Sequence, residues 1–246
     1  MMGITSCHLR GGTTISFDRT TWKWLRNVLL GCNAVWQKTR ICYCKYVERM
    51  QSILDAGYAE EVPKMKLSLQ VVYGICHITV WLMKGSLVKS CVIFYFAAVH
   101  KGLSLNQVLI QGPDLVNNLV GVLLRIRRES VASIADIESM FQQVYVAPRN
   151  WDCLRFLWWP GSDISRDPVI YRMKVHLFGA TSSPRCAKFC LRRVAKDFGA
   201  EFEPVVASTV ERSFYVDVLL TGVPDVENAK VLVKGFCSIL SKLGTT

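Results

Sequence analysis

Two aspartates on predicted β-strands that lie far apart in the chain constrain the fold more than any other feature. Asp136 closes a strand predicted over 131–137, and Asp217 lies in a tight hairpin predicted at 215–218. Alone, either aspartate is an ordinary turn or capping residue. In this order, with a helix predicted between them, the two carboxylates are expected to meet at one sheet, where they could hold divalent cations.

The spacing of apolar residues predicts an α+β chain. One helix is predicted over 46–54 and closed by Gly57, and a second after residue 113, with Asp114 as its N-cap. The other predicted elements are helices from Ser183 and over 225–243 and strands over 154–159 and 169–175. The residues expected to be buried on the second and last helices are Leu115, Leu119, Val122, Leu123, Ile126, Val231, Leu232, Phe236 and Ile239. This mixture, with neighbouring strands linked by hairpins, favours an α+β sheet layered with helices.

The charge of the chain favours a polyanionic partner. The 246 residues include 51% hydrophobic side chains, and 30 Lys and Arg against 19 Asp and Glu give a net charge of +11. A hydrophobic content this high excludes an intrinsically disordered chain. The positive charge indicates binding to nucleic acid or to an acidic membrane surface, although charge that only keeps the protein soluble has the same signature.

The cysteines indicate a reducing compartment. Ten cysteines accompany four histidines, and no Cys-x-x-Cys pair or other zinc-binding spacing occurs. Because no secretory signal peptide is evident, we interpret them as reduced thiols of an intracellular protein, cytoplasmic or nuclear.

Apolar runs at 67–83 and 92–99 leave a small membrane-associated protein open as an alternative. The first run holds Gln70 and His77 and is at the lower limit of length for a spanning helix, so no membrane partner is predicted.

Several stretches of the sequence resemble the reverse transcriptase palm of Bel/Pao-type LTR retrotransposons. They are residues 101–106, 109–115, 135–144, 154–160 and 171–184, and they include Ala135-Asp136-Ile137-Glu138 and Phe178-Gly179-Ala180-Thr181-Ser182-Ser183-Pro184. The resemblance covers about residues 97 to 243. It implies a fragment of a retrotransposon polyprotein, with a reverse-transcriptase-like palm over 96–246 that is truncated before the thumb. Such a palm is expected to be an antiparallel sheet with helices on one face. A degenerate fingers-side region of low order is expected over 1–95.

The resemblance also implies an RNA-directed DNA polymerase activity and its site residues. Asp136 and Asp217 match the catalytic aspartates that bind Mg²⁺ in a two-metal site. Phe141 matches the steric gate against a ribose 2′-hydroxyl, although it also suits a core aromatic. Phe178 and Gly179 match the loop beside the incoming nucleotide, where a small residue permits close backbone approach. The implied partners are an RNA or DNA template–primer and a deoxynucleoside triphosphate.

Four basic residues are expected to bind a nucleic-acid backbone: Arg125, Arg127, Arg128 and Lys174. Such binding would not depend on base sequence and would weaken steeply with salt. The same charges are also compatible with an ordinary solvated surface.

One departure from the family pattern predicts impaired catalysis. The motif Tyr-x-Asp-Asp is Tyr215-Val216-Asp217-Val218 here, so a valine replaces the second aspartate. Valine cannot bind Mg²⁺, and its presence removes one negative charge from a cluster that must balance two dications. Loss of a ligand of this kind usually lowers the rate by orders of magnitude. The alternative is an inactive remnant with at most non-specific affinity for nucleic acid.

A second departure concerns the region before residue 95. In the basic fingers motif of the family, Cys91 replaces the arginine that grips the triphosphate, and Tyr95 replaces the acid. Frameshifts over 21–43 and 71–94 are a hypothesis that explains the unusual Trp, Cys and apolar content of this region.

Overall fold

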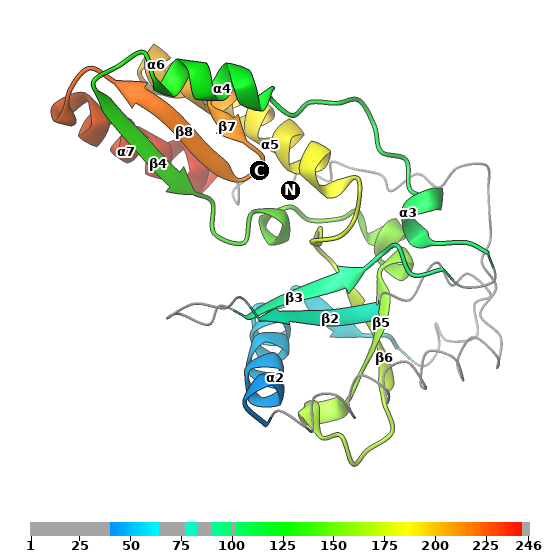
Figure 1. Ribbon diagram of the computed structural model, residues 1–246. Helices are drawn as coiled ribbons and strands as arrows, with labels where there is room; N and C mark the ends of the chain where they lie inside the picture. Colours follow the sequence, from blue (N-terminus) through cyan, green and yellow to red (C-terminus); the bar gives the residue numbers. More distant parts are fainter. Residues whose placement is uncertain (1–39, 64–76, 83–89, 100–101, 243–246) are drawn as a thin grey trace. The chain divides into compact units, whose positions relative to one another are not determined.

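A computed structural model of the protein describes residues 40–63, 77–82, 90–99 and 102–242 (Figure 1). These residues form two compact units. Unit 1 comprises Gln111–Val144 and the described residues from Ser182 onwards, and unit 2 comprises the described residues up to Ile110 together with Tyr145–Thr181. The boundary predicted at residue 95 lies inside unit 2. The division into a fingers-side region and a palm stays a prediction.

Unit 1 is built on a three-stranded antiparallel sheet. Its strands are β4 (Val131–Asp136), β7 (Phe214–Tyr215) and β8 (Val218–Val223), in the order β4-β8-β7. β8 pairs along the whole of β4, from Val131 opposite Val223 to Asp136 opposite Val218. The strand and the hairpin that the sequence predicts are both confirmed, and the sheet brings together segments from distant parts of the chain.

Helices cover both faces of this sheet. They are α4 (Leu119–Ile126), α5 (Ser183–Phe198), α6 (Pro204–Arg212) and α7 (Val226–Ser241), with 3₁₀ turns η3 (Met140–Gln143) and η6 (Gly199–Glu201). The Phe236 ring on α7 meets the Phe214 ring on β7 edge-on, with centroids 6.1 Å apart, and Phe214 is the partner of Leu219. Gly222 points to the other face, where a Cβ would lie 2.8 Å from the Ile126 carbonyl oxygen at the end of α4.

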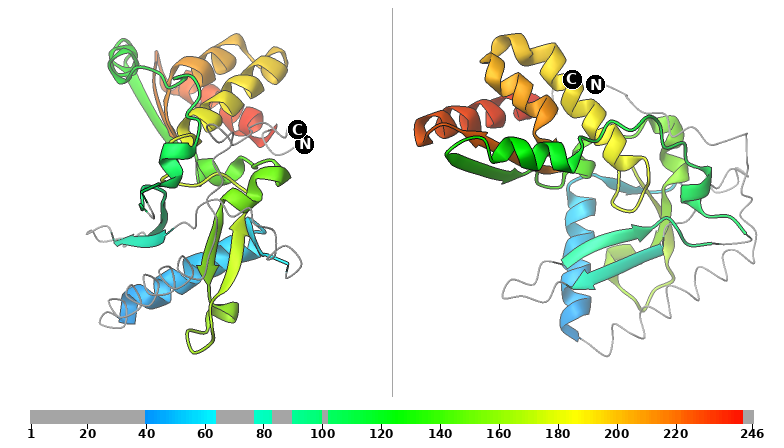
Figure 2. Two further views of the ribbon diagram at one scale, coloured as in Figure 1. Left: turned by 90° about the vertical axis from the view of Figure 1, so that its right-hand side faces the viewer. Right: turned by 45° about the horizontal axis from the view of Figure 1, so that its top comes forward.

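The sheet therefore lies between α4 and α7 (Figures 1 and 2). The family resemblance implied helices on one face, and α4 is the element that differs. Its packing against β8 is possible because Gly222 has no side chain there, so that the backbone at the end of α4 can approach the strand closely.

The second predicted helix begins later than expected. It starts at Leu119 and is capped by Asn118, whose side chain accepts a hydrogen bond from the Gly121 amide at 3.2 Å. Asp114, predicted as the N-cap, instead accepts a hydrogen bond from the Val116 amide at 3.1 Å. An aspartate that binds the amide two residues on favours a local turn over a helix, which explains the delayed start.

The apolar faces predicted for the helices are only partly buried. On α4, Val122 is fully buried, whereas Leu119 is 38% and Leu123 40% exposed. On α7 the predicted face is buried except for Val231, which is 47% exposed. Periodicity indicates which residues share a helix face, but it does not show how much of that face another element covers.

Unit 2 combines segments from both sides of residue 95. Helix α2 (Arg40–Asp55) contains the predicted 46–54 helix and ends before Gly57, whose φ is +70°. Strands β1 (Ala59–Glu61), β6 (Val169–Met173) and β5 (Arg155–Trp158) form one antiparallel sheet in that order, and β2 (His77–Leu82) pairs with β3 (Ser90–Tyr95). The short helical turns are α3 (Leu105–Val108), η4 (Pro148–Cys153) and η5 (Pro160–Ser162).

An aromatic core holds unit 2 together. The rings of Tyr46 on α2 and Trp158 on β5 meet edge-on at 5.1 Å, and those of Phe94 on β3 and Phe156 on β5 at 5.4 Å. All four side chains are buried. Each edge-to-face pair contributes about 0.5–1.5 kcal/mol beyond the area that it buries. The two pairs therefore join β5, which follows residue 95, to two segments that precede it.

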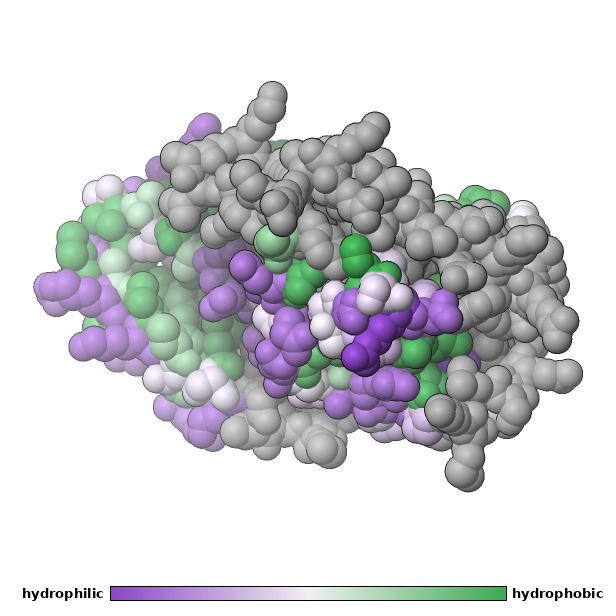
Figure 3. All heavy atoms as spheres, turned by 90° about the horizontal axis from the view of Figure 1, so that it is seen from below, coloured by the Kyte–Doolittle hydropathy of each residue, from purple (hydrophilic) through white to green (hydrophobic). Residues whose placement is uncertain are grey.

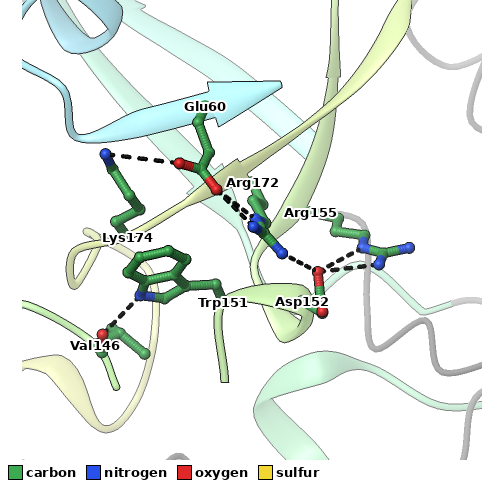
Figure 4. A network of polar contacts seen from close by, with 7 residues as sticks. All are labelled: Glu60, Val146, Trp151, Asp152, Arg155, Arg172 and Lys174. Carbon is green, nitrogen blue, oxygen red and sulfur yellow. Dashed lines mark hydrogen bonds and ion pairs between the residues drawn. The ribbon is translucent and has the colours of Figure 1, made fainter. Parts of the chain in front are cut away.

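A cluster of charges fixes β6 to β1 and to the η4 turn (Figure 4). Arg172 donates to Glu60 on β1 (Nη2 to Oε1, 2.6 Å) and to Asp152 in η4 (Nη1 to Oδ1, 2.9 Å). Arg155 donates to the same Asp152 oxygen at 3.0 Å, and the Lys174 Nζ lies 3.8 Å from the other Glu60 oxygen. Burial would raise the pKa of Asp152, but its bonds to Arg172 and Arg155 outweigh burial and hold the pKa below its ordinary value.

Part of the region predicted to be degenerate lies outside the described residues. This applies to 64–76, to most of the stretch 21–43 and to the side chains of Cys91 and Tyr95. Of the two apolar runs, residues 77–82 form strand β2 and residues 92–95 belong to strand β3, whereas 96–99 lie in a turn and the irregular stretch after it. No helix within the described ranges is long and apolar enough to cross a membrane.

Loss of the Asp152 charge is expected to destabilise unit 2. Asp152→Asn removes the carboxylate that binds two arginines whose side chains are at most 5% exposed, so the free energy of unfolding should fall by about 2–4 kcal/mol. Arg166→Met, which removes an exposed ion pair with Asp163 (3.2 Å), is the control and should cost less than about 1 kcal/mol. Urea unfolding followed by tryptophan fluorescence measures both, and equal effects would contradict a special role for the buried cluster.

Candidate active site

The β4–β8 pairing brings the two predicted catalytic aspartates to the same end of one sheet. Asp136 is the last residue of β4, and its partner is Val218, the first residue of β8. Asp217 directly precedes Val218 in the two-residue turn that joins β7 to β8. The Ile137 amide donates to the Asp217 carbonyl at 3.1 Å. Asp217 is therefore the chain neighbour of Val218, the cross-strand partner of Asp136.

The two carboxylates influence each other electrostatically. Asp217 is half-buried and Asp136 is exposed. Burial raises the pKa of Asp217, and the negative charge of Asp136 raises it further, against the effect of a hydrogen bond from the Asp217 backbone amide. Both effects disfavour the ionised form of the Asp217 carboxyl group. A cation bound beside the two carboxylates would favour the ionised form instead. The arrangement therefore has the electrostatic character of a cation site.

The turn that carries Asp217 is strained. Val216 has a φ of +56°, a conformation that a β-branched residue rarely adopts. A positive φ at the first of two central residues is the mark of a type II′ hairpin turn, where glycine is the usual residue. Strain of this kind persists only where the surrounding structure holds the backbone in place, and it is concentrated at functional sites.

The carboxylates present suit one Mg²⁺ ion but fall short of the predicted two-metal site. Mg²⁺ is usually held by one or two protein carboxylates together with substrate phosphates and water, so Asp136 and Asp217 fit one ion. Cross-strand partners such as Asp136 and Val218 have Cβ atoms about 4.5–5.5 Å apart, so the valine methyl groups stand where a further carboxylate would face Asp136. Within the described residues there is no group of three or more His, Cys, Asp or Glu side chains that could hold a metal.

Phe141, the predicted steric gate, lies in the core of unit 1. It belongs to the 3₁₀ turn η3, which packs against α5, and its side chain is 5% exposed. Ser139 precedes the turn with a φ of +51°. The placement favours the core-aromatic alternative that the sequence left open; contact with a nucleotide stays a prediction.

Phe178 and Gly179, the predicted nucleotide-binding residues, belong to a tightly held loop of unit 2. Gly179 has a φ of +101°, and a Cβ there would lie 2.2 Å from the Phe94 carbonyl oxygen. Asn106 donates to the Gly179 carbonyl at 3.0 Å and accepts from the Thr181 amide at 3.1 Å. The close backbone approach expected at this glycine is thus made to Phe94 of the same unit, and a role toward a nucleotide stays a prediction.

The four predicted nucleic-acid-binding residues have different environments. Arg125 donates to the Arg212 carbonyl in unit 1, and Lys174 takes part in the Glu60 cluster of unit 2. Arg127 and Arg128 are exposed. The latter two are therefore the better placed to contact a phosphate backbone.

The described residues carry little net charge. They include 20 Lys and Arg and 18 Asp and Glu, so most of the +11 charge falls on the rest of the sequence. On the face shown in Figure 3, hydrophilic and hydrophobic residues of the described part are interspersed rather than separated.

Two polar residues that no sequence motif marks lie at the base of the hairpin. Lys188 is 1% exposed on α5, and Asn117 precedes α4. Both donate to the Glu211 carbonyl at the end of α6, at 2.8 Å and 2.9 Å respectively. One sequence feature indicates that Lys188 is buried. It lies three residues before Leu191 and therefore on the apolar face of α5.

Comparison with known proteins shows a similarity of fold to one solved reverse transcriptase structure. No protein-family model and no curated protein matches the sequence. Among solved structures, the chain is similar to a foamy viral protease–reverse transcriptase in complex with double-stranded DNA, with a TM-score of 0.55 and 13% sequence identity. The match covers 78% of this chain and 28% of the viral one, so the chain spans little more than a quarter of the length of that protein. At this identity the likeness concerns the fold alone.

Val216→Gly is expected to stabilise unit 1. A non-glycine residue at positive φ costs about 1–3 kcal/mol, and glycine avoids this at an entropic cost of about 0.5–1 kcal/mol, so a net gain of about 1 kcal/mol should remain. Val218→Gly, in the strand of the same hairpin, relieves no such strain and should destabilise the unit by about 1 kcal/mol. Thermal unfolding at constant pH compares them, and a loss of stability in Val216→Gly would show that the turn is not strained.

Proposed function

We propose that the chain is the palm part of an RNA-directed DNA polymerase, a reverse transcriptase of the Bel/Pao retrotransposon type, with impaired catalysis. The observation that carries the proposal is the convergence of Asp136 and Asp217 at one end of an antiparallel sheet within a reverse-transcriptase-like fold. The sequence stretches that resemble the family, one of which contains Asp136, support the Bel/Pao assignment.

In this proposal, Asp136 and Asp217 hold Mg²⁺ beside the primer end and the triphosphate. The ion would supply electrostatic stabilisation of the charge that develops on the transferred phosphoryl group. The two aspartates orient the ion from a rigid pair of strands, and partial burial of Asp217 excludes some of the competing water. Val218 leaves one position of the site without a ligand, which is the physical reason for impaired catalysis.

The proposed partner is a nucleic-acid template–primer. The viral structure with the similar fold is a complex with double-stranded DNA, and Arg127 and Arg128 are exposed after α4 in unit 1. Neutralisation of phosphates by these two side chains would give contacts that depend on salt and not on base sequence.

Restoring the missing carboxylate is expected to raise polymerase activity. Primer extension on a poly(rA) template with Mg²⁺ should be weak or undetectable with the parent chain, and Val218→Asp should increase the rate by about 100-fold or more. Val218→Asn, of the same shape without the charge, is the matched control. Adding Asp136→Asn to the Val218→Asp chain should abolish the gain. A folded Val218→Asp chain with no extension above the Asp136→Asn background would contradict the proposal.

Removing the two exposed arginines is expected to reduce the salt dependence of nucleic-acid binding. Each phosphate contact to a duplex contributes about 0.9 to the slope of log affinity against log salt concentration. Replacing Arg127 and Arg128 together by Gln should therefore lower the slope by about 1.8. Fluorescence anisotropy with a labelled RNA–DNA duplex measures it. Lys234→Gln, at an exposed position on α7, should leave the slope unchanged; an equal reduction by both changes would contradict a local binding surface.

A further inference from the structure

The hairpin that carries Asp217 starts almost directly at the end of α6. α6 ends at Arg212, and β7 begins at Phe214, so Ser213 is the whole connection. The Ser213 carbonyl accepts a hydrogen bond from the Leu220 amide at 3.0 Å, which ties the connection to β8. With so short a link, the position of the last turn of α6 determines where the hairpin begins.

Lys188 on α5 binds this last turn. Its Nζ donates to the Glu211 carbonyl at 2.8 Å and to the Val210 carbonyl at 3.3 Å. α5 and α6 pack side by side (Figure 1). The last carbonyls of a helix have no partner within the helix and lie at the negative end of its dipole. A buried ammonium group is therefore matched to them in both charge and hydrogen bonding.

Two further donors bind the same junction. The Asn117 side-chain amide donates to the carbonyls of Glu211 and Phe214, both at 2.9 Å, and so bridges α6 and β7. Arg125 on α4 donates to the Arg212 carbonyl. Of the three donors, Lys188 is the most buried, at 1% exposed.

The burial of Lys188 comes at an energetic cost. Burial lowers its pKa to about 8, and the nearby charges of Arg192 and Arg125 act in the same direction, against that of Glu211. A methionine of similar length would fill the space without this cost. The benefit that offsets it must lie in what the ammonium group binds, which is the junction between α6 and the hairpin.

We propose that Lys188 is a positioning residue, which binds the last carbonyls of α6 and thereby fixes the hairpin that holds Asp217 opposite the end of β4. The functional consequence rests on the proposed function, since it requires that Asp136 and Asp217 bind a metal ion together. The structural part, the ordering of the hairpin, can be measured without that assumption.

Hydrogen exchange resolved to peptides tests the structural part. Lys188→Met keeps the length of the side chain and removes its donors, and Lys196→Met, at an exposed position on the same helix, is the control. We expect amides of the hairpin, such as that of Leu220, to exchange about tenfold faster in Lys188→Met, the effect of losing one charge-assisted hydrogen bond. Asn117→Leu should act at the same amides and provides a second test if Lys188→Met does not fold. Unchanged hairpin exchange, or an equal increase in α7, would overturn the inference.

Mn²⁺ affinity measured by electron paramagnetic resonance tests the functional part. The parent chain should bind Mn²⁺ more tightly than Asp136→Asn does, and Lys188→Met should bind at least about threefold more weakly than the parent, with Lys196→Met unchanged. Equal affinity in Lys188→Met and the parent would overturn the positioning role while leaving the proposed function intact. If the parent and Asp136→Asn bind equally, the proposed function fails instead, and hydrogen exchange alone decides whether Lys188 orders the hairpin.

Discussion

The antiparallel pairing of β4 with β8 is the interaction on which the rest of unit 1 depends. It runs over the full length of both strands and places Asp136 opposite Val218. Because side chains alternate between the faces of a sheet, a slip of one residue would turn Asp136 to the opposite face, away from the Asp217 turn. The helices reinforce this register from two sides. Gly222 lets the end of α4 close onto one face, and Phe236 of α7 packs against the other.

The candidate site brings two carboxylates to one end of a sheet but holds less charge than the family pattern. Asp217 lies in a strained turn whose backbone is fixed at Val216, and its carboxylate is close enough to Asp136 for the two charges to repel. Strain and repulsion both cost stability, and backbone strain of this kind is concentrated at functional sites. Val218 contributes neither a ligand nor a charge. The proposed function accounts for both costs, because strain and repulsion are features that a metal site would require.

Much of the fold could be predicted from local sequence patterns. The strand ending at Asp136, the Asp217 hairpin and helix α5 have clear periodicity and turn residues, and the structure contains them. Helix α6 was not predicted, because its apolar residues are few and its end is fixed by Lys188 and Asn117 from elsewhere in the chain. The same limit applies to Phe141 and Gly179. Their residue types suit a nucleotide site, but their burial and close approach to other backbone depend on tertiary contacts that a sequence pattern does not contain.

The aromatic core of unit 2 has a consequence for where the chain can be divided. The sequence resemblance begins near residue 97, which invites the isolation of the segment from there onwards. Such a segment would lack Tyr46 and Phe94, the two rings that cover Trp158 and Phe156. Two large aromatic side chains would then face water on a strand that is buried along its whole length in the intact chain, and the excised piece would self-associate. The start of the sequence resemblance and the start of the folded unit are therefore different places in this polypeptide.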